Sequence, residues 1–169
     1  PGDNIGKQLF QVEDNEGKMA DRGVDLYQAD FDFVKTMGMQ IVRGRDFSRD
    51  VAADTTYAVL VNEAMVKRMA WDEPLGKKFV LQGAGPNNTD VEKRVVGVIK
   101  DYHQNSLYEV IEPLMIILDR NFRFVFVRTN EGDVSESLST IEGIWKEIFP
   151  NSPFEYDFLD QDFNSDGTF

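Results

Sequence analysis

Short runs of hydrophobic residues alternate along the chain with polar, glycine-containing connections, at spacings typical of strands and short helices. Runs with β-branched or aromatic residues predict strands, at 7–12, 24–29, 57–61, 75–82, 94–100 and 113–118, with a further short strand and turn within 40–47. The polar stretch 13–23 predicts a hairpin connection between the first two strands.

Two short helices are predicted between these strands. Segment 31–37 predicts a helix that ends at Gly38, because glycine readily adopts the left-handed conformation at a helix end. Asn62 predicts an N-cap for a helix over 63–71, which stops before Pro74. The remaining polar stretches predict loops at 49–56 and 83–90.

The last third of the chain predicts a β-α-β unit. Segment 122–128 alternates phenylalanine with other residues and predicts a strand, and 153–159 alternates in the same way. Asp133 and Glu136 have the spacing of a capping box at a helix start. The helix that follows carries one apolar stripe, formed by Val134, Leu138, Ile141, Trp145 and Ile148. A helix packed on a sheet gives the α+β fold class.

Composition narrows the class of protein. With 169 residues, 41% of them hydrophobic, the chain can bury a core as a single domain. A formal net charge of −12 argues against nucleic acid and anionic lipid as partners. The chain has no cysteine, which excludes disulfides and cysteine-based metal sites. It contains no apolar stretch of about 20 residues and begins without methionine, so we expect a fragment of a longer protein.

The single histidine is the first candidate for chemistry. Asp101 and His103 are two residues apart, so on an extended chain they point to the same side, and Ser106 is the nearby hydroxyl. A hydrolase using these three residues is one alternative, although Ser106 lacks a G-x-S-x-G context. One histidine cannot form a multi-histidine zinc site. A structural hydrogen bond in a strand-end turn is the favoured interpretation.

The acidic tail offers a second alternative, a calcium-dependent binding domain. Its residues match the first six positions of an EF-hand loop at Asp162, Asn164, Asp166 and Gly167. The bidentate glutamate required at the twelfth position is missing, because the chain ends at Phe169. We therefore favour a solvated terminus, and predict no metal ligand, no catalytic residue and no cofactor.

Several ordered landmarks together resemble a known family. They are "FDFVKTMGMQIVRGRDFSRD", "AVLVNEAMVKRMAWDEPLGKKF", "RVVGVIKDYHQNSLYEVIEPLM" and "VFVRTNEGDVSESLSTIEGIWKEIFPNSPFEYDFLDQDFN". Over roughly residues 25–164 the chain resembles the extracytoplasmic core domain of MacB/FtsX-type ABC-transporter permeases, in the form common in Bacteroidetes-like genomes.

The resemblance implies a two-lobed fold for residues 1–169, inserted between transmembrane helices of the parent protein. It suggests a β-rich lobe over 1–93 and a partial porter-like α/β lobe over 94–164. The family motif falls on Asp101, His103, Ser106, Leu107, Glu112 and Pro113. We expect these residues to shape a turn at the lobe boundary and to be candidates for contact with a partner.

The resemblance also implies a function. The domain would be non-catalytic and would lie on the periplasmic side of the inner membrane. It would couple cytoplasmic ATP hydrolysis to efflux, export or action on a periplasmic partner. The expected partners are an ATPase domain or subunit, a second permease copy in a dimer and a periplasmic adaptor.

Overall fold

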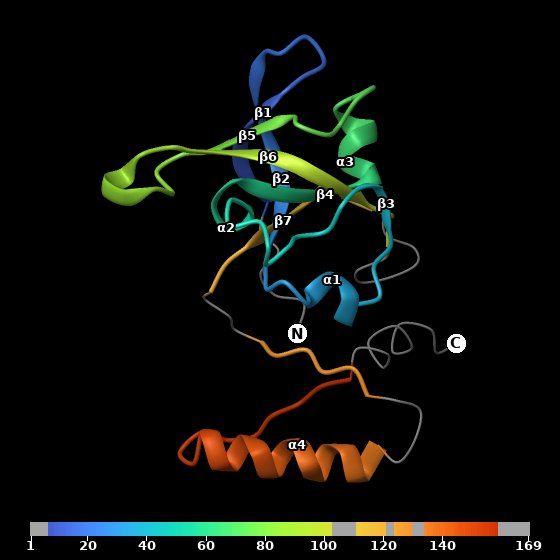
Figure 1. Ribbon diagram of the computed structural model, residues 1–169, viewed down its shortest axis with the longest axis vertical. Coiled ribbons are helices and arrows are strands. Elements are labelled where there is room, and N and C mark those ends of the chain that lie inside the picture. The colour runs from blue at the N-terminus through green and yellow to red at the C-terminus, as the bar shows by residue number, and fades with distance from the viewer. Residues whose placement is uncertain (1–6, 103–110, 121–123, 130–133, 159–169) are drawn as a thin grey trace. The chain divides into compact units, whose positions relative to one another are not determined.

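The computed structural model describes residues 7–102, 111–120, 124–129 and 134–158 (Figure 1). Contacts divide the chain into two compact units, Gly2–Phe126 and Val127–Phe169. The lobes at 1–93 and 94–164 stay a prediction. Position 93 lies within a strand that joins the sheet of the larger unit.

The strands of the larger unit form one sheet whose pairings close into a ring. They are β1 Lys7–Glu13, β2 Met19–Ala29, β3 Ile41–Gly44, β4 Ala58–Asn62, β5 Lys78–Leu81, β6 Val91–Ile99 and β7 Leu114–Leu118. Their order is β3-β6-β4-β7-β2-β1-β5, and β5 also pairs with β6. Strand β3 is therefore the additional strand beside the ring. These pairings confirm the strands predicted between residues 7 and 118, and β2 starts earlier than predicted because Met19 already pairs with Glu13.

Strand β6 pairs with three other strands of this sheet. It pairs in parallel with β4 on one side and antiparallel with β5 and β3 on the other. Gly97 on β6 allows the chain after β3 to come close, since a Cβ there would lie 2.2 Å from the carbonyl oxygen of Arg45. A larger residue would collide with backbone, which explains the glycine.

Hydrophobic side chains fill both faces of the sheet. On β4, Val59 and Val61 face the core inside the ring, whereas Leu60 faces the outer core. Helix α3 (Glu63–Arg68) covers the inner core with Met65, and helix α1 (Phe33–Thr36) covers the outer core with Val34. Burial on both faces explains why β4 and β7 are continuous apolar runs.

The helices of the larger unit are shorter than the sequence predicts. Helix α3 ends at Arg68, before the predicted end at 71, because Ala70 takes a left-handed φ of 50°. Each predicted loop gives rise to one turn of helix. Helix α2 (Asp54–Tyr57) begins in the loop 49–56 and includes Tyr57, which was predicted to start the next strand, and the 3-10 turn η1 (Pro86–Asn88) lies within 83–90.

The smaller unit corrects the β-α-β prediction. Helix α4 (Val134–Ile148) forms as predicted, but the described segments 124–128 and 153–158 on either side are not strands. Alternation alone does not make a strand, because a strand also needs a neighbour to complete its hydrogen-bond ladder. Instead, ring contacts hold the return segment on the helix, with Phe154 lying 6.2 Å from Trp145 between ring centroids.

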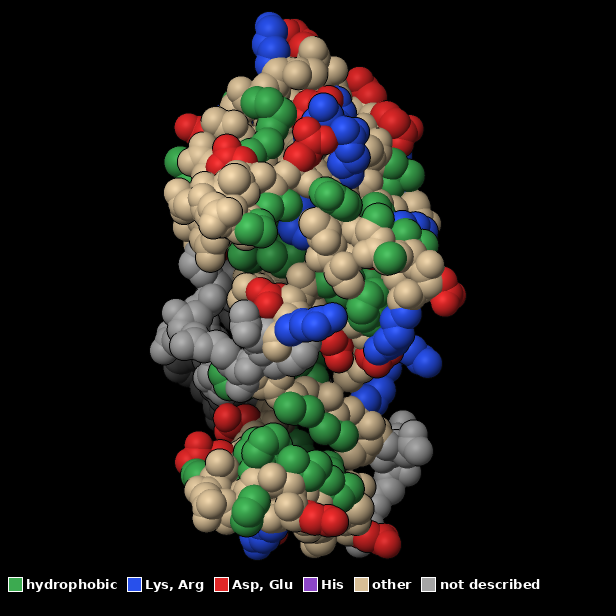
Figure 2. All heavy atoms as spheres, turned by 60° about the vertical axis from the view of Figure 1, so that its left-hand side comes forward, with side chains coloured by type: hydrophobic (Ala, Val, Ile, Leu, Met, Phe, Trp, Pro, Cys, Tyr) green, Lys and Arg blue, Asp and Glu red, His purple; other side chains and the backbone are tan. Residues whose placement is uncertain are grey.

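Helix α4 keeps an apolar surface. Val134, Ile144 and Ile148 are each about half exposed, and Figure 2 shows hydrophobic side chains gathered on the unit that carries this helix. No helix in the described part of the chain is both long and apolar enough to cross a bilayer. The fold class is confirmed at the level of a mixed α and β fold in which strands dominate.

Candidate functional site

The described residues of the predicted family motif lie around the start of helix α3. Asp101 follows the end of β6, and Glu112 and Pro113 lead directly into β7. His103, Ser106 and Leu107 lie outside the described residues, so the predictions for them remain predictions. The acidic tail from Asp162 to Gly167 also lies outside them.

Asn62 is the centre of this arrangement. Its side chain, 1% exposed, sits where β4 passes into α3. Its Oδ1 accepts hydrogen bonds from the backbone N–H groups of Met65 at 3.0 Å and Leu114 at 2.9 Å. Its Nδ2 donates to the carbonyl oxygen of Glu112 at 2.8 Å. One buried amide therefore caps the helix and binds both residues flanking Pro113, which confirms the predicted N-cap.

Asp101 adds a second cap to the same helix. Its Oδ1 accepts from the backbone N–H of Ala64 at 2.8 Å. In return, its own backbone N–H donates to Glu63 Oε2 at 3.0 Å. Carboxylates are favoured at a helix start because they pair with unsatisfied N–H groups. Together these bonds join the ends of β4, β6 and β7 to α3, and we call Asn62, Glu63, Asp101 and Glu112 the capping junction.

Charged groups surround the outer side of the capping junction. The Glu112 carboxylate lies 3.3 Å from Lys7 Nζ and 3.6 Å from an Arg68 guanidinium nitrogen. These pairs are substantially exposed, so they contribute little to stability. Burial raises the pKa of the neighbouring Asp25 carboxyl, with Lys7 opposing and Glu112 adding to the shift. The backbone N–H of Asp25 donates to the carbonyl oxygen of Pro113 at 3.0 Å.

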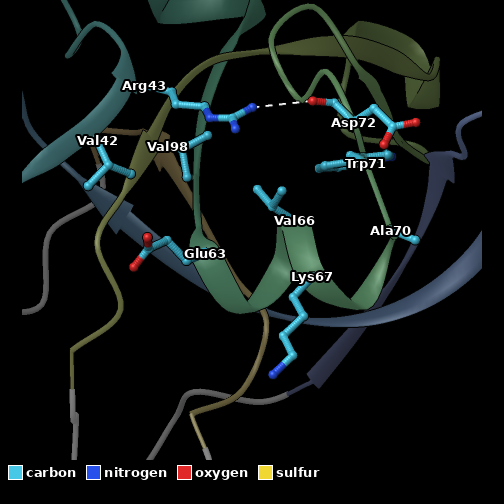
Figure 3. Close-up of a pocket in the computed structure, with 9 residues that line it drawn as sticks. All are labelled: Val42, Arg43, Glu63, Val66, Lys67, Ala70, Trp71, Asp72 and Val98. Carbon is cyan, nitrogen blue, oxygen red and sulfur yellow. Dashed lines mark hydrogen bonds between the residues drawn. The ribbon is translucent and has the colours of Figure 1, made fainter.

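A groove runs beside the capping junction, between α3 and β3 (Figure 3). It has a volume of about 460 Å³ and is lined by Val42, Arg43, Glu63, Val66, Lys67, Ala70, Trp71, Asp72 and Val98. Arg43 spans one end and donates to the carbonyl oxygen of Asp72 at 3.2 Å. Glu63 belongs both to the groove and to the capping junction, so the two features share helix α3.

A second group of hydrogen bonds joins Asp54 to the "RGRDF" segment and the residue after it. Asp54, 2% exposed, accepts two hydrogen bonds from Arg45 at 2.6 and 2.8 Å and one from the backbone N–H of Ser48 at 2.8 Å. The Arg45 hydrogen bond holds the pKa of the Asp54 carboxyl below its usual value. Sequence reasoning missed Asp54, because it lies in a stretch read as a polar loop.

The polar side chains described above form hydrogen bonds that stabilise the fold. The side chains of Asn62 and Asp101 bind backbone groups of elements that are distant in the sequence, whereas Asp54 binds Arg45 and Ser48 in the nearby segment after β3. In the part of the chain that the structure describes, no group of three or more metal-ligating side chains comes together. The capping junction and the groove beside it make up the candidate site of the described residues.

Comparison with known proteins agrees with this arrangement. The sequence model of the MacB-like periplasmic core domain matches residues 5–141. None of the curated proteins matches the chain.

Two solved structures are similar in fold. The periplasmic region of MacB from Actinobacillus actinomycetemcomitans aligns with a TM-score of 0.55 at 14% identity, over 94% of this chain and 75% of that one. A domain of a protein described as a permease, from Porphyromonas gingivalis, aligns with a TM-score of 0.54 at 20% identity, over 93% of this chain and 77% of that one. With the family match extending over most of its length, the chain belongs to the MacB-like periplasmic core domain family.

Proposed function

We propose that the chain is a non-catalytic periplasmic domain that couples cytoplasmic ATP hydrolysis to export or to action on a periplasmic partner. The observation that carries this proposal is the family match over residues 5–141. The structure adds a physical argument, because the landmark residues Asn62 and Asp101 form hydrogen bonds that join separate elements. Such ties suit a domain that transmits movement.

The partners follow from the same proposal. The parent protein is an inner-membrane permease with this segment on the periplasmic side, working with an ATPase domain or subunit. A second permease copy and a periplasmic adaptor complete the assembly. The family-motif residues remain candidates for contact with a partner, and they are Asp101, His103, Ser106, Leu107, Glu112 and Pro113.

A test of the coupling separates export from ATP hydrolysis in the parent permease. Leu60 is 0% exposed and packs in the outer core, so Leu60→Asp is expected to disrupt the domain. The matched control is Leu9→Asp, because Leu9 on β1 is 71% exposed. We expect Leu60→Asp to abolish export while ATP hydrolysis continues, and Leu9→Asp to leave both close to normal.

The measurement compares export and ATP hydrolysis at equal membrane levels of the variants, with protease digestion reporting whether the domain is folded. Normal export by the Leu60→Asp permease, with the domain demonstrably unfolded, would contradict the proposal.

A further inference from the structure

The capping junction links three strand ends to a single helical turn. The side chain of Asn62 binds backbone groups of Glu112 and Leu114, which precede and begin β7. The side chain of Asp101, just after β6, binds the second residue of α3. The first turn of α3 therefore depends on both the C-terminal end of β6 and the N-terminal end of β7.

The same turn forms a wall of the groove. Glu63, Val66 and Lys67 line it, and Glu63 also accepts the backbone N–H of Asp101. Helix α3 spans only Glu63–Arg68, so it is too short to be stable without its caps and its packing. A shift at either strand end would break cap hydrogen bonds, and the first turn of α3, which lines the groove, would then change.

We infer that the capping junction is a conformational coupling device, in which the ends of β6 and β7 and the first turn of α3 change state together. Displacement of either strand end changes the first turn of α3, which lines the groove, and a change in that turn alters how firmly the two strand ends are held. This inference goes beyond the proposed function, because it concerns an equilibrium within this chain that exists with or without a permease.

Amide hydrogen exchange in the 169-residue chain tests the coupling. Among the described residues, Asp101→Ala removes the acceptor of the Ala64 N–H. The N–H groups of Met65 and Leu114 keep their acceptor, Asn62 Oδ1. If the junction acts as one unit, exchange at Met65 and Leu114 also rises, by about fivefold, the effect of losing one cap of about 1 kcal/mol.

The matched control is Asp90→Ala. Asp90 Oδ1 likewise accepts a backbone N–H, that of Gly83, in an exposed loop away from α3. We expect this variant to leave exchange at Met65 and Leu114 unchanged. Asp101→Asn keeps an oxygen acceptor and is expected to restore exchange close to that of the unchanged chain.

Two outcomes would overturn the inference. In the first, exchange in Asp101→Ala rises at Ala64 alone, which would mean that the caps act independently. In the second, it rises equally at β1 and β2 amides, which would indicate global unfolding. If Asp101→Ala does not fold, Glu63→Ala removes the acceptor of the Asp101 N–H instead and must raise exchange at Met65 and Leu114. Neither result depends on transport activity.

Discussion

Two of the buried charged side chains, Asp54 and Lys93, form hydrogen bonds with specific partners. Asp54 is paired with Arg45, and Lys93 donates from its ammonium to the carbonyl oxygen of Thr56 at 2.6 Å. Burial lowers the pKa of Lys93 and raises that of Asp25, since desolvation disfavours the charged form of either group. We therefore expect substitutions of these residues to change the free energy of unfolding by different amounts.

Asp54→Ala should lower the free energy of unfolding by about 2 kcal/mol, because a buried carboxylate loses charged hydrogen bonds. The pKa of Asp54 is lowered on folding, so its stabilising contribution is present above the ordinary value of 3.8 and is lost as the pH falls further. Urea denaturation at neutral and acidic pH measures both effects. Asp32→Ala, which breaks a geometrically similar but exposed pair with Arg49, should cost clearly less. Equal losses in the two variants would contradict the role of burial.

Asp25→Asn should stabilise the fold at neutral pH. The pKa of Asp25 is raised on folding, so the native state binds its proton more tightly than the unfolded state. Stability from this group is present at pH values below 3.8 and is lost as the pH rises through the higher folded pKa. The neutral amide removes that loss, and the gain should shrink in acid. Asp21→Asn, at an exposed position of the same strand, is the control. A gain independent of pH would contradict the assignment.

At the scale of elements, the sequence predicts features that depend on neighbouring residues and misses features that depend on segments distant in the sequence. Strands β4 and β7 and the Asn62 N-cap could be predicted, because a hydrophobic run or an N-cap depends on residues that are adjacent in the sequence. The flanks of α4 were predicted as strands from alternation, but strand formation depends on a neighbouring chain segment that the pattern does not contain. Asp101 and Glu112 were predicted as family-motif residues and Asn62 as an N-cap, but their meeting in the capping junction was not predicted, because the bonds from Asn62 to Glu112 and Leu114 span about fifty positions.

Close packing between β3 and β6 should make Gly97 intolerant of substitution. A Cβ at Gly97 would lie 2.2 Å from Arg45 backbone and 2.9 Å from Leu60 Cδ2, so the strands must separate. We expect Gly97→Ala to destabilise the fold by about 1–3 kcal/mol. Gly143→Ala in α4 is the matched control, because a Cβ there meets nothing within 4 Å and alanine favours helix. Thermal unfolding of both variants gives the comparison, and a neutral Gly97→Ala would refute the packing described for β6.

At the scale of the whole molecule, the two compact units differ in how they are stabilised. The unit Gly2–Phe126 contains the closed ring and both hydrophobic cores. The unit Val127–Phe169 contains α4, in which no residue is fully buried. We therefore expect the larger unit to fold without the smaller one.

A fragment of residues 1–126 should retain the ring. Trp71 is then its only tryptophan, since the chain has two and the other is Trp145. Trp71 is buried and donates from Nε1 to the Glu13 carbonyl oxygen at 2.8 Å, so its fluorescence should stay blue-shifted and should change cooperatively in urea. Emission typical of an exposed indole, without a transition, would show that the ring needs the smaller unit.

The central claim, that this domain stands in the periplasm as part of a permease, is tested most directly by labelling a single cysteine in intact cells. The chain has no cysteine of its own, and Leu9 is 71% exposed, so Leu9→Cys gives a unique reactive site within it. In the parent permease, we predict labelling by a membrane-impermeant maleimide reagent admitted to the periplasm, without disruption of the inner membrane. Labelling only after the inner membrane is permeabilised would contradict the account.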